Sequence, residues 1–370
     1  MAATTADHSS DRHSRTNGYD GYFFLATICY LHPIISDVAA SSLHIILYNE
    51  GMSEFDLIAH YFVRPAHPKN RATLGIGDDC ALLLQQDGMH TAISSDMLVE
   101  GRHFFVGADA YKLGHKSLAV NLSDLAAMGA EPVAFTLALS LPSADEPWLA
   151  NFSAGLFALA DQHNCELIGG DTTKGPLNIC ITIFGQTPIG TALRRDTAQI
   201  GDDIWVSGTL GEARLALGAM RKEYELDIAT LNAASVRLHT PQPRVTLGLA
   251  LRGIAHSALD VSDGLIGDLG HILKKSAVGA TLNVDALPAG AALQKQPEEL
   301  RRRFTLAGGD DYELCFTAPA SKREAVLGAA LAADTNVTRI GVIDETLGTR
   351  LLDRDGQPVD LQIASFDHFA

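Results

Sequence analysis

The sequence lacks the short motifs that identify several common enzyme classes. It contains no G-x-x-x-x-G-K-[ST], which excludes a P-loop nucleotide site, and neither H-E-x-x-H nor G-x-S-x-G, which mark zinc peptidases and α/β-hydrolases. Gly75-x-Gly77 runs into Asp78 instead of continuing to a third glycine. A carboxylate at that point would repel a pyrophosphate, so the segment is not a dinucleotide fingerprint.

Basic residues are also scarce. The chain has 28 Lys and Arg against 44 Asp and Glu, a net charge of -16. Such a surface disfavours nucleic-acid binding, which needs positive charge against the phosphate backbone. Charged residues make up only 19% and apolar residues 46%, which argues for a folded core and against extensive disorder. An acidic protein that handles phosphates would need divalent cations.

Cysteine pairs and long apolar runs are missing as well. The five cysteines are scattered without a C-x-x-C pair, at Cys29, Cys80, Cys165, Cys180 and Cys315. We interpret them as small buried apolar residues in a reducing compartment. No apolar run has the length needed to cross a membrane. The expectation is a cytoplasmic protein without a membrane or nucleic-acid partner.

Residues 1–51 do not share the regular pattern of the rest. Residues 1–20 are polar and aperiodic, and Tyr22–Leu31 forms an apolar run. A secretory signal is one interpretation, but no Lys or Arg cluster precedes the run and no clear cleavage site follows it. We favour a disordered or non-native extension, with Met52 as the start of the functional protein.

From Met52 onward, helical and strand patterns alternate. We predict an α/β (α+β) protein of two halves that meet near residue 190 and pack closely, with domains at 52–190 and 191–370. The predicted helices are 54–62, 111–128, 146–163, 211–221, 245–255, 265–275 and 321–333. The predicted strands are 80–84, 91–95, 132–141, 165–168, 178–188, 203–207, 258–261, 280–284, 312–317, 338–343 and 350–352.

Aspartates recur where glycine or serine follows an apolar run. The first case is Gly75–Leu83, in which two glycines lead into Asp78 and Asp79. The theme returns at four later places: Asp96 after Ser94 and Ser95, Asp124 after Ser123, Asp171 after Gly170, and Asp260 with Asp263 around Ser262. Gathered carboxylates can hold hard metal ions, which in turn hold phosphates.

Each of these residues also has an ordinary interpretation. Asp79 and Asp171 suit turns, and Ser94–Asp96 or Ser262–Asp263 suit helix caps. His103 is compatible with a plain loop. Asp124 and Lys116 lie two helical turns apart on nearly one face, so a structural ion pair is an alternative. Taken together, so many acidic residues at the ends of apolar segments favour a metal-phosphate site.

The residues from Met52 to the end resemble the thiamine-monophosphate kinases, of the superfamily that includes aminoimidazole ribonucleotide synthetase. The most specific match is the block Ala119–Ala130, and Phe366–Phe369 is similar to the end of those proteins. The other matching segments are Gly75–Leu83, Ser94–Phe104, Leu167–Pro176, Ala258–Gly270 and Gly308–Phe316.

The resemblance implies that ATP phosphorylates thiamine monophosphate to thiamine diphosphate with several Mg²⁺ ions. Because the attacking oxygen belongs to the substrate's own ionised phosphate, no protein base is needed, and we predict direct in-line transfer with no catalytic side chain. It implies a two-domain fold like aminoimidazole ribonucleotide synthetase, in which the N-terminal ATP- and Mg-binding domain pairs into a dimeric β-barrel, so a homodimer is expected. The implied metal ligands are Asp79, Ser94, Ser95, Asp96, Asp124, Asp171, Asp260 and Asp263. The implied ATP contacts are Gly170, Asp171, Arg195 and Ser262, and the implied substrate contacts are His103, Asp310 and Phe366.

Two residues depart from the pattern of that family. Ser95 stands where threonine is usual, which is a conservative change, and Asp310 stands where glutamate is usual. The shorter side chain puts the contact of residue 310 with the substrate in question.

Two other functions are compatible with parts of the pattern. One is a different ATP-using member of the superfamily, such as aminoimidazole ribonucleotide synthetase or selenophosphate synthetase. The latter requires a reactive cysteine before the metal motif, whereas the first cysteine after Met52 is Cys80, inside it. The other is a non-catalytic metal- or nucleotide-binding module, against which the full acidic set argues.

Overall fold

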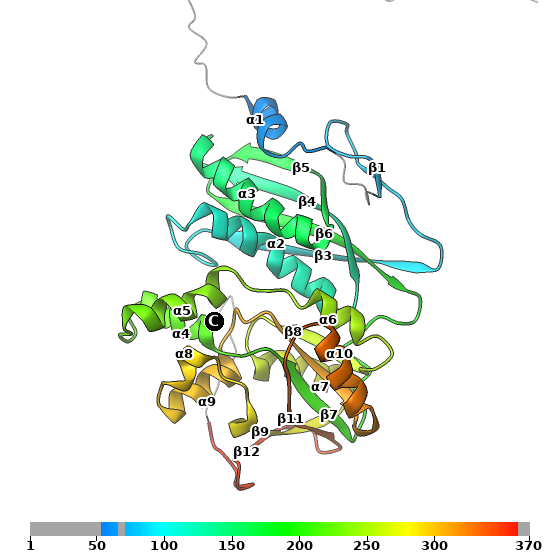
Figure 1. Cartoon of the computed structure of the whole chain (residues 1–370), viewed down its shortest axis with the longest axis vertical. Helices are drawn as coiled ribbons and strands as arrows, with labels where there is room; N and C mark the ends of the chain where they lie inside the picture. The colour runs from blue at the N-terminus through cyan, green and yellow to red at the C-terminus, as the bar shows by residue number, and fades with distance from the viewer. Residues whose placement is uncertain (1–52, 66–70, 362–370) are drawn as a thin grey trace, which may run out of the picture. The chain divides into compact units, whose positions relative to one another are not determined.

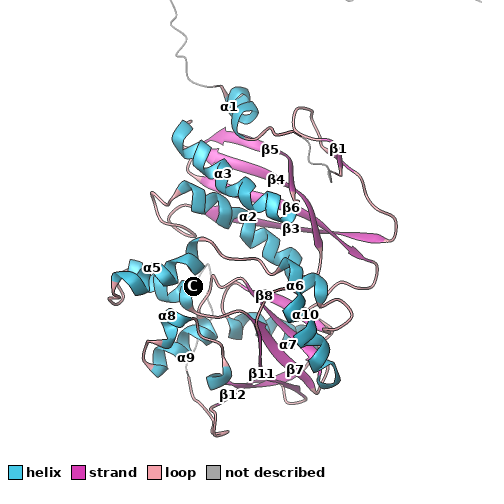
Figure 2. Cartoon of the chain, in the orientation of Figure 1, coloured by secondary structure: helices cyan, strands magenta, loops and turns pink. Residues whose placement is uncertain are grey.

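The structure is a computed structural model, and it describes residues 53–65 and 71–361 of the chain (Figures 1 and 2). The described residues belong to one compact unit. The prediction for residues 1–51 and the assignment of Phe366 both lie outside the described residues.

A four-stranded sheet forms the first half of the described chain. Its order is β3-β6-β4-β5; only the β4–β5 pair is parallel, and the other pairs are antiparallel. The strands are β3 (Met89–Val99), β4 (Glu131–Leu141), β5 (Glu166–Lys174) and β6 (Asn178–Pro188). Helices α2 (Ala110–Ala127) and α3 (Glu146–His163) lie side by side on one face of this sheet (Figure 1). Helix α1 (Glu54–Tyr61) and the short strands β1 (Ala72–Leu74) and β2 (Leu82–Leu83) precede it.

A six-stranded sheet forms the second half (Figure 2). Its order is β12-β9-β11-β7-β10-β8, with only the β12–β9 pair parallel. Its strands are β7 (Asp202–Ser207), β8 (Ser257–Val261), β9 (Gly279–Asn283), β10 (Glu313–Pro319), β11 (Val337–Asp344) and β12 (Gly348–Leu352). Its helices are α4 (Glu212–Met220), α5 (Ile228–His239), α6 (Val245–Ala250), α7 (Leu265–Ser276), α8 (Ala291–Gln294), α9 (Glu298–Ala307) and α10 (Arg323–Ala332).

Local sequence explains the ends of the long helices. Asp109 and Asp145 cap α2 and α3, because each carboxylate accepts a hydrogen bond from a backbone N–H in the first turn. Gly129 follows α2 with φ +60°, a left-handed conformation that favours glycine and turns the chain into β4. These signals fix where α2 begins and ends, and thereby the position of Asp124 near its C-terminal end.

One hydrophobic cluster joins the two sheets. It contains Leu122 of α2 and Phe135 of β4 together with Leu247 of α6 and Phe316 of β10. A second cluster packs α7 against the other face of the six-stranded sheet, with Leu269 among its members. Because α2 contributes to the shared cluster, its one acidic residue, Asp124, lies where the two halves meet.

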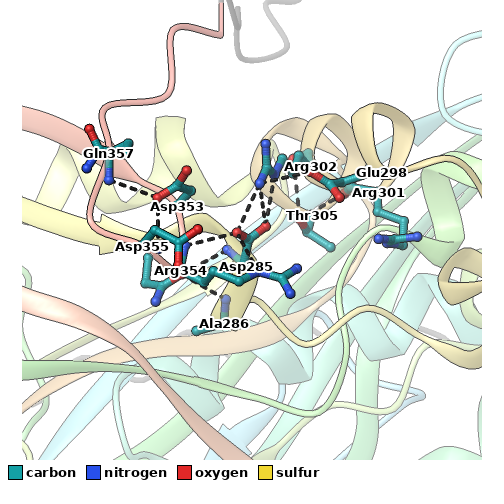
Figure 3. Close-up of polar contacts among 11 residues, drawn as sticks. Asp285, Ala286, Glu298, Arg301, Arg302, Thr305, Asp353, Arg354, Asp355 and Gln357 are labelled. Atoms are coloured by element: carbon teal, nitrogen blue, oxygen red, sulfur yellow. Dashed lines mark hydrogen bonds and ion pairs between the residues drawn. The ribbon is translucent and has the colours of Figure 1, made fainter.

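A polar network holds the last strand against the helices (Figure 3). Both oxygens of Asp285 accept hydrogen bonds from the Arg302 guanidinium at 2.9 Å, and the backbone N–H of Arg354 donates to the same carboxylate at 3.0 Å. Arg302 also pairs with Glu298 at 2.9 Å on the same helix. The network fixes α9 and the turn after β12 to one another.

Most predicted elements are confirmed, with boundaries that match or are shifted by up to six residues. Helices α5, α8 and α9 and strand β1 were not predicted. Contrary to expectation, Asp171 lies inside β5 and not in a turn, and Ser94–Asp96 lie in the middle of β3 and not at a cap or a strand end. Cys165 and Cys315 are buried as expected, whereas Cys80 is exposed. No helix in the described part of the chain is long and apolar enough to cross a membrane.

Candidate active site

The principal cavity, of about 1050 Å³, lies between α2, β3 and the loops that flank β8 and β10. It brings together residues that are far apart in the sequence. Seven of the predicted site residues line it: Asp96, His103, Asp124, Asp260, Ser262, Asp263 and Asp310. A space of this size suits a ligand of drug size or larger.

Three carboxylates form the acidic side of the cavity. Side chains alternate along a strand, so Ser94 and Asp96 of β3 both face α2. The Ser94 hydroxyl donates a short hydrogen bond to Asp124 Oδ2. Asp260, at the end of β8, is 6% exposed and accepts a hydrogen bond from Ser123 Oγ at 2.8 Å.

These carboxylates disturb one another. Burial, followed by repulsion from Asp124, raises the pKa of Asp96 to about 7. Burial, then Asp124, raises the pKa of Asp260 to about 8, with the Ser123 hydrogen bond opposing the rise. Burial also raises the pKa of Asp124, although its hydrogen bond from Ser94 and the positive charge of Arg195 oppose the shift. The cluster is therefore short of positive charge, which is the situation a bound cation would relieve.

A second, smaller cavity of about 420 Å³ shares Asp124 with the first. Ser94, Arg195 and Lys275 line it as well. Arg195 and Lys275 are exposed cations, in contrast to the acidic side of the main cavity. The smaller cavity thus offers positive charge beside the acidic cluster, an arrangement that suits a polyphosphate.

The loop after β8 is shaped by Asp268 of α7. Its Oδ2 accepts hydrogen bonds from the backbone N–H groups of Ser262, Asp263 and Gly264 at 3.0, 3.1 and 3.1 Å. The sequence-based alternative, a cap provided by Ser262 or Asp263, is wrong, because neither side chain caps α7. Asp268 instead fixes the loop that presents both residues to the cavity.

His103 and Asp310 also line the cavity. His103 Nδ1 accepts a hydrogen bond from the backbone N–H of Val99 at 3.0 Å. Asp310 has φ +66° and pairs with Lys116 Nζ at 2.8 Å. The suggested Lys116–Asp124 pair is therefore wrong, since the ammonium group reaches across to the C-terminal half.

The remaining predicted residues are not gathered in this cavity. Ser95 points to the opposite face of the sheet, where its Oγ lies 3.0 Å from Thr182 Oγ1. Gly170 and Asp171 belong to β5, which two intervening strands place about 14 Å from β3. Asp79 lies in an exposed segment before β2 and lines neither cavity. Within residues 53–65 and 71–361, no group of three or more acidic, histidine or cysteine side chains is already arranged to hold a metal ion.

Sequence reasoning missed Asp268 and Tyr312, which shape this site, and it gave Lys116 the wrong partner. Burial raises the pKa of Tyr312 well above its usual value, and the charges of Asp310, Asp96 and Asp260 raise it further. A lysine inside an apolar helix is a visible signal, but its partner is almost 200 positions away in the chain. Acidic residues are common in the first turn of a helix, where Asp268 lies. The sequence alone therefore does not mark Asp268 as a residue of the site.

Comparison with known protein families gives two matches. Residues 77–187 match the family described as "AIR synthase related protein, N-terminal domain". Residues 199–353 match "AIR synthase related protein, C-terminal domain".

Individual proteins are similar over most of the chain. The thiamine-monophosphate kinase of Salmonella typhimurium is 46% identical over 319 residues, 86% of this chain and 98% of that protein. The crystal structure of thiamine-monophosphate kinase from Stenotrophomonas maltophilia is similar at 49% identity with a TM-score of 0.74, covering 79% of this chain and 93% of that one. A structure of AaThiL complexed with AMPPCP and TMP is similar at 27% identity with a TM-score of 0.68, covering 77% and 89%.

Proposed function

This chain belongs to the thiamine-monophosphate kinase family of the AIR synthase related proteins, and we propose on that premise that it transfers a phosphoryl group from ATP to thiamine monophosphate. The products are ADP and thiamine diphosphate, in thiamine biosynthesis. The observation that carries the proposal is one cavity lined by the partly or fully buried carboxylates Asp96, Asp124 and Asp260 together with His103 and Asp310. Such a space can hold an acceptor with its phosphate beside the acidic cluster.

The proposed roles follow the position of each residue. Arg195, with Ser94 in the smaller cavity, binds the ATP phosphates, and Ser262 in the principal cavity is a further ATP contact. Gly170 and Asp171 line neither cavity, and their assignment to ATP rests on the family resemblance alone. His103, Asp310 and Phe366 bind thiamine monophosphate. The attacking atom is an oxygen of the substrate's own phosphate, which is already ionised, so no side chain has to remove a proton. Direct in-line transfer without a phosphoenzyme is the simplest mechanism for this site.

Mg²⁺ fits the donor set of the acidic cluster. Asp96, Asp124 and Asp260 are hard oxygen donors whose burial and mutual repulsion raise their pKa values. Ser94 and Asp263 line the two cavities and are further proposed ligands, and phosphate oxygens of the substrates would complete the set. Asp79, Ser95 and Asp171 line neither cavity, so as proposed ligands they would hold other ions than the one at this cluster. When bound, Mg²⁺ would neutralise phosphate charge and let the two anionic substrates approach each other.

A single assay separates this function from the alternatives. The full chain is incubated with ATP, Mg²⁺ and one acceptor at a time, and ADP release and the phosphorylated product are measured. We expect turnover with thiamine monophosphate and none with thiamine, which lacks the accepting phosphate. Turnover with a different acceptor would favour another synthetase of the superfamily, and nucleotide binding without turnover would favour a non-catalytic module.

We further propose that the four-stranded sheet pairs with its copy as a dimeric β-barrel, and that the two domains divide near residue 190. In the described chain the sheet is open, and β3 is an edge strand with unpaired backbone groups. Ile93 and Met97, on its face away from α2, are 64% and 53% exposed. A second sheet would cover this apolar strip.

Sedimentation velocity tests the dimer directly. The parent protein should sediment as a dimer, and Ile93→Lys should shift it to the monomer because a buried ammonium at the interface is costly. Leu331→Lys, at a site 84% exposed on α10, is the control and should leave the mass unchanged. A monomeric parent protein at micromolar concentration would contradict the proposal.

A further inference from the structure

Lys116 is a buried cation in the wall of the principal cavity. Its side chain is 5% exposed and projects from α2, a helix whose neighbouring positions Leu113 and Val120 are apolar and buried. A buried ammonium is unfavourable unless it is paired and hydrogen-bonded. Its partner is Asp310 Oδ1, at 2.8 Å, on the loop before β10. The pair therefore joins the two halves of the protein inside the cavity.

The backbone around Asp310 is fixed independently of Lys116. The N–H of Asp310 donates to the carbonyl of Ser262, and the N–H of Tyr312 donates to the carbonyl of Val261, both at 2.8 Å. Asp310 and Tyr312 have φ +66° and +50°, so the loop adopts a left-handed conformation that its hydrogen bonds must maintain. These backbone hydrogen bonds do not set the direction of the Asp310 side chain, which depends on what the carboxylate contacts.

The two carboxylate oxygens of Asp310 differ in the hydrogen bonds that they accept. Oδ1 accepts hydrogen bonds from Lys116 Nζ at 2.8 Å and from the Tyr312 hydroxyl at 3.3 Å. Oδ2 accepts none from any residue in the described part of the chain. One oxygen is thus held by the protein, and the other is left for a donor in the cavity.

We infer that Lys116 is a positioning residue for the acceptor substrate, acting through Asp310. The inference rests on the proposed function, in which Asp310 contacts thiamine monophosphate. Lys116 has two effects: it turns the carboxylate so that Oδ2 is available to an N–H donor such as the aminopyrimidine of thiamine, and it cancels the charge of Asp310. Without that cation, Asp310 would add a fourth negative charge to the side of Asp96, Asp124 and Asp260, and its orientation would be lost.

The test compares Lys116→Met with Lys322→Met. Lys322, just before α10, is exposed, forms no ion pair with any described residue and lines neither cavity, so its variant loses the same charge without losing the Asp310 contact. Calorimetry with thiamine monophosphate, Mg²⁺ and a non-hydrolysable ATP analogue gives the Kd, and steady-state kinetics gives KM and kcat. Lys116→Met should weaken binding by about tenfold or more, the effect of losing a charged hydrogen bond, with kcat at saturation little changed. Lys322→Met should change Kd by less than about twofold.

A double-mutant cycle identifies the route of the effect. If Lys116 acts through Asp310, then Lys116→Met should add little to the loss of affinity already caused by Asp310→Asn. Lys116→Arg keeps the charge and should retain most of the affinity, and Lys116→Gln replaces Lys116→Met if the latter does not fold.

Three results would overturn parts of this account in distinguishable ways. Additive losses would mean that Lys116 contacts the ligand directly. Equal affinities of the Lys116→Met and Lys322→Met variants would remove the role of Lys116 altogether. A parent protein that neither binds nor phosphorylates thiamine monophosphate would overturn the proposed function itself.

Discussion

Asp124→Asn should reduce turnover by about a thousandfold, the equivalent of about 4 kcal/mol of lost transition-state stabilisation when a metal-binding carboxylate is removed. Asp124 lines both cavities, so it is placed between the two proposed substrates. The amide keeps the shape of the side chain and still offers an oxygen to the Ser94 hydroxyl. The fold should therefore be retained, and the loss should appear in kcat measured over a range of Mg²⁺ concentrations.

The same variant should be more stable than the parent protein when no metal is present. Folding raises the pKa of Asp96 to about 7 and of Asp260 to about 8, in each case through burial first and repulsion from Asp124 next. Unfolded aspartate titrates near pH 4. The stability contributed by these two groups is thus complete below about pH 4 and is lost as the pH rises through about 7 to 8.

Thermal melting in excess EDTA between pH 5 and pH 9 measures this effect. The melting temperature of the parent protein should fall with rising pH, and Asp124→Asn should reduce that fall by about 2–4 °C for each kcal/mol of repulsion removed. Asp87→Asn, at an exposed turn, is the control and should leave both turnover and the pH profile unchanged. Near-normal turnover of Asp124→Asn at modest Mg²⁺ would mean that this cluster is not the metal site.

The parts of the fold that sequence predicts best are those with strong local signals. Helix α3 and strand β6 have the predicted boundaries, because an Asp145 cap or a long β-branched run is visible without tertiary information. Helix α9 gives no such signal, since it has three consecutive arginines and few apolar residues. It is held by the pairing of Arg302 with Asp285, a contact between elements. Helix α5 was missed for the related reason that alanine, serine and threonine dominate it.

The candidate site shows the same contrast between features that local sequence predicts and features that tertiary packing decides. Aspartates after apolar runs identify Asp96, Asp124 and Asp260 as a group, and the structure places them around one cavity. The sequence does not show on which face of a strand each side chain lies, or which partner it contacts. Ser95 faces away from Ser94 because strand side chains alternate, and Lys116 pairs with Asp310 because the two halves meet at α2. Such pairings depend on tertiary packing and leave no local pattern.

The largest expected effect on stability comes from Glu313, a carboxylate with no exposed surface. Arg244 donates two hydrogen bonds of 2.6 Å to it, Ser207 donates one of 2.5 Å, and Arg237 donates another. The two arginine side chains are themselves 16% and 19% exposed. Glu313 thus anchors the end of α5 and the start of α6 to β10, directly after the loop that carries Asp310 and Tyr312.

Glu313→Gln should lower the free energy of unfolding by about 3–5 kcal/mol, because it leaves two largely buried guanidinium groups beside a neutral amide. Guanidinium chloride unfolding followed by circular dichroism gives the value, and Glu324→Gln, at an exposed position of α10, should change it by less than about 0.5 kcal/mol. Adding Arg244→Met to Glu313→Gln should restore part of the loss, since the penalty comes from the unpaired charge and not from the missing contact. A loss below about 1 kcal/mol, with no recovery in the double variant, would show that water reaches these arginines and that the network does not hold α5 and α6 in place.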